Sequence, residues 1–245
     1  MRSMSCLSGG NAVMNLRKRI VLLLAFLLTL QLTACGSNHG VDSHPDPNSP
    51  YAIGDIVSLG GLDWLVLDVQ DGQVLVISES VLSQRAWHPE QKSLSWEISE
   101  IRQYLNGPFF EDSFTDEERG RIIETEVINN ANPRFGAAGP GRDTMDRVFL
   151  LSVEEVIQYF GDSGRLENPE ERDAILTDEY DSLRVARHIE TDSVSWWWLR
   201  TPGHHLNPLL HASAAVVGGA GEVFLYGIYV ISDGGGVRPV LWLRV

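Results

Sequence analysis

Residues 62–78 read Leu-Asp-Trp-Leu-Val-Leu-Asp-Val-Gln-Asp-Gly-Gln-Val-Leu-Val-Ile-Ser, and this stretch decides the fold class. Two runs rich in large apolar and β-branched residues, Leu62–Val69 and Gln73–Ser78, flank Asp71-Gly72, a pair suited to a tight hairpin turn. Leu62–Leu67 is apolar on both alternating faces, so we expect it to be an interior strand. The sequence therefore predicts a buried β-hairpin.

Further strand patterns lie outward from this hairpin, on both sides of a helical middle. Asp55–Leu59 precedes it, and the C-terminal part carries four strand-like runs: Ser195–Arg200, Ala212–Val217, Glu222–Tyr226 and Val237–Arg244. Glycine-rich turns at 218–221 and 233–236 separate the last three runs. This order of strands, helices and strands predicts an α+β fold, a single mixed domain whose N- and C-terminal strands share a sheet.

The middle of the chain holds signals for helix starts. Thr115–Glu118 and Ser152–Glu155 both match the capping box, and the second predicts a helix that ends at Phe160. The other elements we expect are a helix capped by Ser95 or Ser99 and running through Asn106, a strand over Met145–Leu151, and a helix over Pro169–Leu176.

The N-terminal 34 residues have the pattern of a removable leader. Arg17–Arg19 precede an unbroken apolar run, Ile20–Leu30, which is too short for a comfortable membrane span. The run leads into Leu32-Thr33-Ala34-Cys35, which looks like the bacterial lipobox. We therefore expect 1–34 to be a lipoprotein signal peptide, with Met14 as a second candidate start.

This resemblance implies that Cys35 carries a lipid. In proteins with this signal, a diacylglyceryl thioether forms on the cysteine, cleavage occurs just before it, and the new amine is acylated, for example by palmitate. Several acyl chains make a durable anchor. The alternatives are an ordinary secretory signal with a chance cysteine, or an uncleaved helix. Residues 35–50, rich in turn formers, would then be a lipidated disordered tether, and 51–245 the globular domain.

Charge and cysteine content exclude several classes of function. Loss of the leader removes four of the 19 basic residues and no acid, so 15 basic residues face 33 acidic ones, a net charge of −18. Such a surface repels nucleic acid and anionic headgroups, so the lipid must provide membrane attachment. Cys6 leaves with the leader, so the mature domain has no free thiol for disulfides, nucleophilic catalysis or zinc.

The candidate ligand-binding residues are Trp196, Trp198, Arg200 and Arg238. In a strand, Trp196, Trp198 and Arg200 share one face, where two rings and a guanidinium would suit a sugar or a planar ligand. The alternative is a strand buried on both sides with a paired arginine. Arg238 follows a glycine turn, where we expect it in a buried or half-buried ion pair.

Other patterns support neither catalysis nor a metal or cofactor. His204, His205 and His211 share one loop but lack the spacing of metal ligands. The acids between Glu167 and Asp181 lack the alternation of a calcium loop, so we expect a solvated face. Gly161–Gly164 is similar to a serine protease nucleophile segment, but a turn after the helix explains it.

Five motifs, taken together, resemble a bacterial family of extracytoplasmic domains without an established activity: Trp64–Leu67, Ile101–Asn106, Phe149–Ser152, Trp197–Gly203 and Gly236–Pro239. The resemblance covers about Tyr51 to Val245. The Gly-Val-Arg-Pro ending is also distantly similar to sulfatase-modifying-factor domains, which have a C-type-lectin-like fold. It implies a mixed fold with long loops and carries over no catalysis, because the formylglycine-generating members need paired cysteines.

The leading expectation is a non-enzymatic lipoprotein, anchored at the extracytoplasmic face of the cell membrane, whose domain binds a ligand such as a glycan. One alternative is a hydrolase that uses two suitably spaced carboxylates, as glycosidases do. Another is a structural partner of an envelope protein, for which an exposed apolar patch would be the sign.

Overall fold

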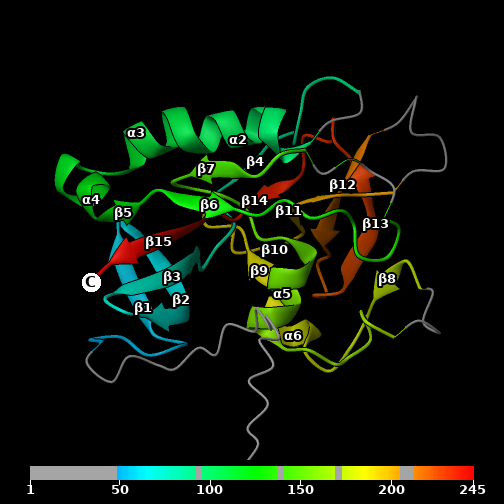
Figure 1. The fold of residues 1–245 in the computed structure, drawn as a ribbon, viewed down its shortest axis with the longest axis horizontal. Coiled ribbons are helices and arrows are strands. Elements are labelled where there is room, and N and C mark those ends of the chain that lie inside the picture. The colour runs from blue at the N-terminus through cyan, green and yellow to red at the C-terminus, as the bar shows by residue number, and fades with distance from the viewer. Residues whose placement is uncertain (1–48, 92–94, 137–138, 140, 169–172, 205–211) are drawn as a thin grey trace, which may run out of the picture. The chain divides into compact units, whose positions relative to one another are not determined.

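The structure is a computed structural model that describes residues 49–91, 95–136, 139, 141–168, 173–204 and 212–245. All described residues lie in one compact unit. The expected leader, Cys35 and the tether up to residue 48 lie outside the described residues. The described part is a mixed α+β structure, as the sequence predicts (Figure 1).

A five-stranded sheet contains both the N-terminal hairpin and the C-terminal strand. Its strands, in spatial order, are β1 (Ile56–Leu59), β2 (Leu62–Gln70), β3 (Gln73–Ser78), β15 (Val240–Arg244) and β5 (Ile122–Ile123), all paired antiparallel. The hairpin register pairs Gln70 with Gln73, and Gly72 takes a φ of +69° in the turn. The predicted interior position of β2 is confirmed, and the N- and C-terminal strands share one sheet as predicted, with β15 paired to β3.

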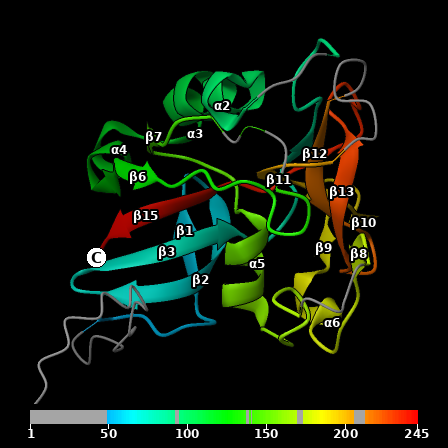
Figure 2. The same cartoon turned by 45° about the vertical axis from the view of Figure 1, so that its right-hand side comes forward.

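A six-stranded sheet carries the tryptophan-rich strand. In spatial order it contains β4 (Ser83–Gln84), β14 (Gly236–Val237), β11 (Trp197–Pro202), β12 (Ser213–Val217), β13 (Val223–Tyr229) and β8 (Ile175–Leu176). Two ribbons complete the strands: β6 (Thr125–Val127) with β7 (Thr144–Asp146), and β9 (Ala186–Arg187) with β10 (Val194–Ser195). In Figures 1 and 2 the β1–β3 hairpin and the β12–β13 pair lie at opposite ends of this unit.

The helices are short, and α2, α4 and α5 begin at predicted caps. Thr115 opens α4 (Asp116–Arg121) and Ser152 opens α5 (Val153–Phe160), each with a complete capping box. Ser99 caps α2 (Glu100–Tyr104), preceded by the 3-10 turn η1 (Trp96–Ile98). A π-type turn, η2 (Leu105–Phe109), follows and leads into α3 (Phe110–Ser113). The last helix is α6 (Asp181–Arg184). α5 lies between the two ends of the unit (Figure 2).

The Gly236–Pro239 motif is the crossing between the two sheets. β14 pairs with β4 and β11 in one sheet, whereas β15 pairs with β3 and β5 in the other. The predicted continuous strand Val237–Arg244 is therefore wrong, because the chain leaves one sheet at Val237 and joins the other at Val240. The Ser78 N–H donates to the Pro239 carbonyl at 2.9 Å, which fixes the crossing against the end of β3.

Three other predicted elements differ from the structure. Ser195–Arg200 is not one strand, because Trp196 separates β10 from β11. Met145–Leu151 is a strand only through Asp146, and Phe149 later makes an isolated bridge to Val240. Residues 169–172 of the predicted Pro169–Leu176 helix lie outside the described residues, and Ile175–Leu176 form strand β8 instead, because they pair with β13.

One connected apolar core joins residues from both sheets and from α5. It includes Trp64 and Val76 of the first sheet, Trp197 and Val216 of the second, and Val156 of the helix, all fully buried. Among the described residues, no helix is both long and apolar enough to cross a membrane.

Candidate functional site

The tryptophan-rich strand β11 is buried on both faces. Trp197, Trp198 and Leu199 are inaccessible to solvent, and their neighbour Trp196 is half-buried with its ring edge-on to Trp198 at 4.9 Å. The indole N–H of Trp198 donates to the Arg85 carbonyl at 2.9 Å. Of the two interpretations of this strand, the packing agrees with the one in which both faces are core.

Arg200 is paired inside the protein. It is 3% exposed and makes a two-pronged ion pair with Glu155, at 2.7 Å from Nη2 to Oε1. Its two terminal nitrogens also donate to the carbonyls of Leu150 and Ile128, each at 2.9 Å. Because Glu155 also completes the capping box of α5, Arg200 ties β11 to the start of that helix.

Arg238 is buried without the predicted ion pair. It is 3% exposed, its Nε donates to the Ser78 carbonyl at 2.9 Å, and its guanidinium lies 5.1 Å from the Trp197 ring centre. Among the described residues, no carboxylate lies within ion-pair distance of it. Burial lowers the pKa of Arg238 to about 10. Carbonyls and ring faces replace the expected carboxylate, because the chain crosses between the sheets at this point.

A pocket forms beside β12 and β13, and its first lining residue lies two residues beyond the end of β11. We call it the aromatic pocket; it encloses about 340 Å³ and is lined by His204, Ser213, Tyr226, Gly227, Ile228 and Tyr229. Tyr226 and Tyr229 are 38% and 44% exposed, so both rings present accessible surface. Ligand binding by Trp196, Trp198, Arg200 and Arg238 stays a prediction, and of these four only Trp196 is more than marginally exposed.

Two glycines allow the strands to approach closely enough to form the pocket. A Cβ on Gly203 would lie 2.4 Å from the Tyr226 carbonyl oxygen, and one on Gly227 would lie 2.2 Å from the Ala214 carbonyl oxygen. Gly227 also has a φ of +79°, a conformation that side chains disfavour, where the β12–β13 register shifts. The Trp197–Gly203 motif therefore ends at the pocket.

Hydrogen bonds fix the pocket wall. The His204 N–H donates to the Tyr226 carbonyl at 2.9 Å, and the Ser213 hydroxyl donates to the same carbonyl at 2.9 Å. The His204 ring stacks on Phe135 at 4.5 Å. Buried Asn132 places Phe135, since its amide donates to the Pro202 and Leu225 carbonyls and accepts from the Phe135 N–H.

The lining of the aromatic pocket carries no Asp, Glu, Lys or Arg side chain among the described residues. His204, His205 and His211 were predicted to share one loop, and the last two lie outside the described residues. Among the described residues, no group of three or more His, Cys, Asp and Glu side chains is placed to hold a metal ion. Aromatic rings, a hydroxyl and an imidazole are thus the groups that this pocket offers.

The acidic stretch is only partly a solvated face. Asp178 is inaccessible and pairs with inaccessible Arg184 at 2.9 Å, and Asp181 joins the pair at 3.1 Å. Burial raises the pKa of Asp178, but hydrogen bonds from Arg184, Ser163 and the Tyr180 N–H outweigh it, so the pKa is lowered. The expectation of solvated acids is wrong here, because Arg184 binds the carboxylate inside the protein.

A second recess, of about 390 Å³, contains two carboxylates. Its lining includes Gly60, Asp112 and Glu118. Glu118 accepts from the Gly60 N–H and from the Thr115 N–H, each at 2.8 Å, and these hydrogen bonds lower its pKa. Glu118 is therefore held as a carboxylate that caps backbone groups, which does not suit a general acid.

A family model described as a domain of unknown function, DUF6273, matches residues 71–245. The chain belongs to the DUF6273 family. The match covers every strand from β3 onward, and so includes the aromatic pocket and the crossing between the sheets. No curated protein and no solved structure matches the chain.

Within this DUF6273 chain, sequence reasoning missed Ser213, Tyr226, Gly227 and Tyr229. The predicted strand Glu222–Tyr226 stops just before Gly227, whereas β13 extends to Tyr229. The sequence does contain a signal: Gly227 lies inside the run Phe224–Tyr229, and a glycine within an aromatic strand pattern indicates a bulge or a close backbone approach.

Proposed function

We propose that this DUF6273 protein is a lipoprotein, anchored through Cys35 at the extracytoplasmic face of the membrane, whose domain binds a glycan or cell-wall fragment in the aromatic pocket. The observation that carries the binding proposal is the pair of half-exposed tyrosines, Tyr226 and Tyr229, beside the His204 imidazole in one recess. The leader sequence and lipobox carry the anchoring proposal.

The chemistry of the pocket favours an uncharged, hydroxylated ligand. Tyrosine rings offer apolar faces to the C–H groups of a sugar, while phenol, hydroxyl and imidazole groups exchange hydrogen bonds with its oxygens. A ligand with several charges would have no ionic partner in the lining. We also propose the finer expectation of a C-type-lectin-like arrangement, supported by the pairing of β15 with β3.

The alternatives have less support. A carboxylate-dependent hydrolase needs two free carboxyl groups across a cleft, and in the Gly60 recess Glu118 is already bound by two backbone N–H groups. A structural role in an envelope complex would need a larger apolar patch than the scattered exposed residues indicate.

Thermal unfolding of purified residues 36–245 with a panel of neutral and charged bacterial glycans tests the binding proposal. This piece contains the whole described core. A ligand that binds the native state raises Tm through linkage. For a glycan that does so, Tyr226→Ala should weaken binding at least about tenfold, or about 1.4 kcal/mol. Titration calorimetry measures the two affinities.

Tyr51→Ala is the matched control, since Tyr51 is a partly exposed tyrosine shortly before β1, and β1 lies at the other end of the unit from β13 (Figure 1). It should leave the affinity unchanged. Trp196→Ala in the same series tests the sequence-predicted contacts, because Trp196 is the accessible member of that set. Equal affinities for the wild type and Tyr226→Ala, or no glycan that raises Tm, would argue against the aromatic pocket as the binding site.

A further inference from the structure

Exposed and half-buried apolar side chains lie close together in the sequence where the described chain begins. Ile53 is 62% exposed, the highest value among the large apolar side chains of the described residues, and Ile56 is 45% exposed. The half-buried Tyr51 lies two residues before Ile53. We call Tyr51, Ile53 and Ile56 the tether-end surface.

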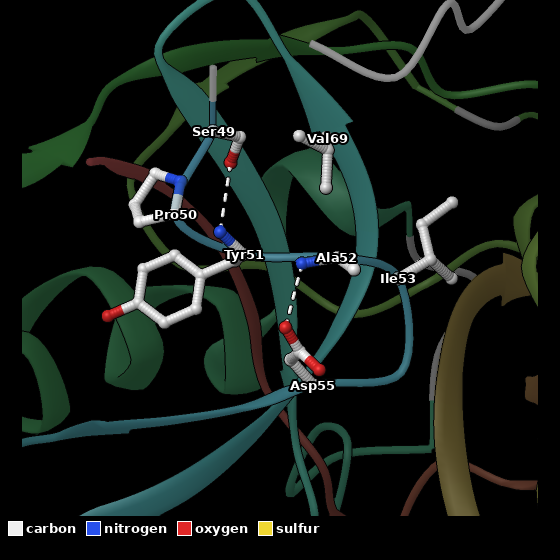
Figure 3. A pocket seen from close by; sticks show the side chains of 7 residues that line it. All are labelled: Ser49, Pro50, Tyr51, Ala52, Ile53, Asp55 and Val69. Atoms are coloured by element: carbon white, nitrogen blue, oxygen red, sulfur yellow. Dashed lines mark hydrogen bonds between the residues drawn. The ribbon is translucent and has the colours of Figure 1, made fainter. Parts of the chain in front are cut away.

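Ile53 belongs to a hydrogen-bonded turn between Ala52 and Asp55 (Figure 3). The Ala52 N–H donates to the Asp55 carboxylate at 2.8 Å, and the Asp55 N–H donates back to the Ala52 carbonyl at 3.1 Å. The Gly54 N–H donates to the Val66 carbonyl at 2.9 Å, which ties the turn to β2. These hydrogen bonds hold Ile53 in its exposed position.

An open recess of about 450 Å³ lies beside the turn, lined by Ser49–Ile53, Asp55 and Val69. Its wall is largely apolar, through Pro50, Tyr51 and Val69. The side chains at its rim therefore have room to contact an apolar partner without displacing the core.

The length of chain before this surface indicates what the partner is. Only 13 residues separate Cys35 from Ser49. Fully extended, these 14 steps reach roughly 50 Å, whereas a flexible tether averages roughly 20 Å. If Cys35 holds the lipid, the tether keeps the turn close to the bilayer at a high effective concentration. This step rests on the proposed lipid anchor.

We propose that the tether-end surface contacts the interfacial region of the bilayer that holds the Cys35 lipid. Isoleucine side chains and a tyrosine ring suit the boundary between headgroups and acyl chains. The net charge of −18 of the mature chain opposes approach to an anionic membrane, so the attraction is apolar. The contact would direct β12, β13 and their aromatic pocket away from the membrane, since they lie at the opposite end in both views (Figures 1 and 2).

The test uses residues 35–245, in which Cys35 is the single cysteine and couples to a maleimide lipid. In vesicles of brominated zwitterionic lipid, the added tryptophan of Ile53→Trp should be strongly quenched relative to vesicles without bromine. Ile98→Trp is the matched control, because Ile98 is 51% exposed and ends η1, two residues before α2, which lies on the opposite side of the unit from β1 (Figure 1). Its added tryptophan should not be quenched.

Quenching of Ile53→Trp that exceeds that of Ile98→Trp, and that disappears when Cys35 is left uncoupled, supports the contact. Equal quenching of the two coupled variants overturns it. In vesicles that also contain anionic lipid, added salt should increase the quenching of Ile53→Trp, because it screens the repulsion; a decrease would show that the contact is ionic. Chemical coupling replaces biological lipidation, so failure here leaves the anchoring proposal intact.

Discussion

Trp196 and Trp198 contact each other, yet only Trp198 is inaccessible to solvent. Truncation of a fully buried tryptophan removes its transfer free energy and leaves a cavity, so Trp198→Ala should lower the free energy of unfolding by about 3–5 kcal/mol. Trp196→Ala, at a half-buried position, should cost about 1 kcal/mol. Urea unfolding followed by circular dichroism measures both. Equal costs would mean that the exposed and buried members of the pair are wrongly assigned.

The Asp178–Arg184 pair makes a prediction about pH. The pKa of Asp178 lies below its ordinary value of 3.8, so its carboxylate stabilises the fold above that pH, and the contribution is lost as the pH falls through the folded pKa. Asp178→Asn leaves buried Arg184 with Asp181 as its remaining carboxylate and should cost about 3 kcal/mol at pH 7, the lower end of the range for a broken buried pair. The stability gap between wild type and variant should narrow below pH 3.8.

Asp173→Asn is the control for this pair, because Asp173 is 72% exposed and lies 3.8 Å from Arg165. An exposed pair contributes at most about 1 kcal/mol. Unfolding curves at neutral and acid pH should therefore separate the two variants. If the difference in free energy of unfolding between wild type and Asp178→Asn stayed constant down to about pH 3, the lowered pKa of Asp178 would not be the cause of that difference.

At the scale of elements, the aromatic pocket depends on the bulge at Gly227. Gly72 and Gly227 both have positive φ, +69° and +79°, but a Cβ on Gly72 meets nothing within 4 Å, whereas one on Gly227 lies 2.2 Å from the Ala214 carbonyl oxygen. Gly72→Ala should cost about 1 kcal/mol of backbone strain. Gly227→Ala should cost clearly more and also weaken ligand binding. Thermal unfolding and a titration of both variants give the comparison, and equal costs would contradict the close packing of β12 on β13.

The elements that local chemistry specifies were predictable from the sequence. The Asp71-Gly72 hairpin and the capping boxes at Thr115 and Ser152 are set by neighbouring residues, and all three are confirmed. The break between β14 and β15 was not predictable from the sequence. Val237–Arg244 reads as one apolar run, and only tertiary pairing divides it. Ile175 likewise becomes a strand residue through its pairing with Phe224.

The site was less predictable than the fold, for a reason visible in Trp198 and Tyr226. A sequence pattern cannot say which face of a strand is covered by another element, and both faces of β11 are covered. The accessible aromatic residues are instead on β13, beyond Gly227, where the bulge changes the alternation of faces. Because β11 is buried on both faces, the accessible candidate site lies at the tyrosines of β13 and not at the tryptophans of β11.

At the scale of the whole molecule, the two proposed contacts lie at opposite ends of the described unit (Figures 1 and 2). The tether-end surface leads back along the chain to Cys35, and the aromatic pocket lies at the far ends of β12 and β13. The ion pair of buried Arg200 with Glu155 joins β11 to α5, and β11 leads toward the pocket. The ion pair therefore fixes the strand that leads into the pocket against α5.

The anchor itself gives the last prediction, since the thioether needs the thiol of one residue. In a bacterial host fed an alkyne analogue of palmitate, the full-length chain should be labelled and found in the membrane fraction. Cys35→Ala should lose both label and membrane retention, whereas Cys6→Ala should keep both, because Cys6 lies in the leader. High salt should not release the wild type: its mature charge of −18 gives no ionic attraction to an anionic membrane, and several acyl chains hold it by apolar burial. Labelling that survives Cys35→Ala would place the lipid elsewhere, and release by salt would mean that the protein is held by a charged partner.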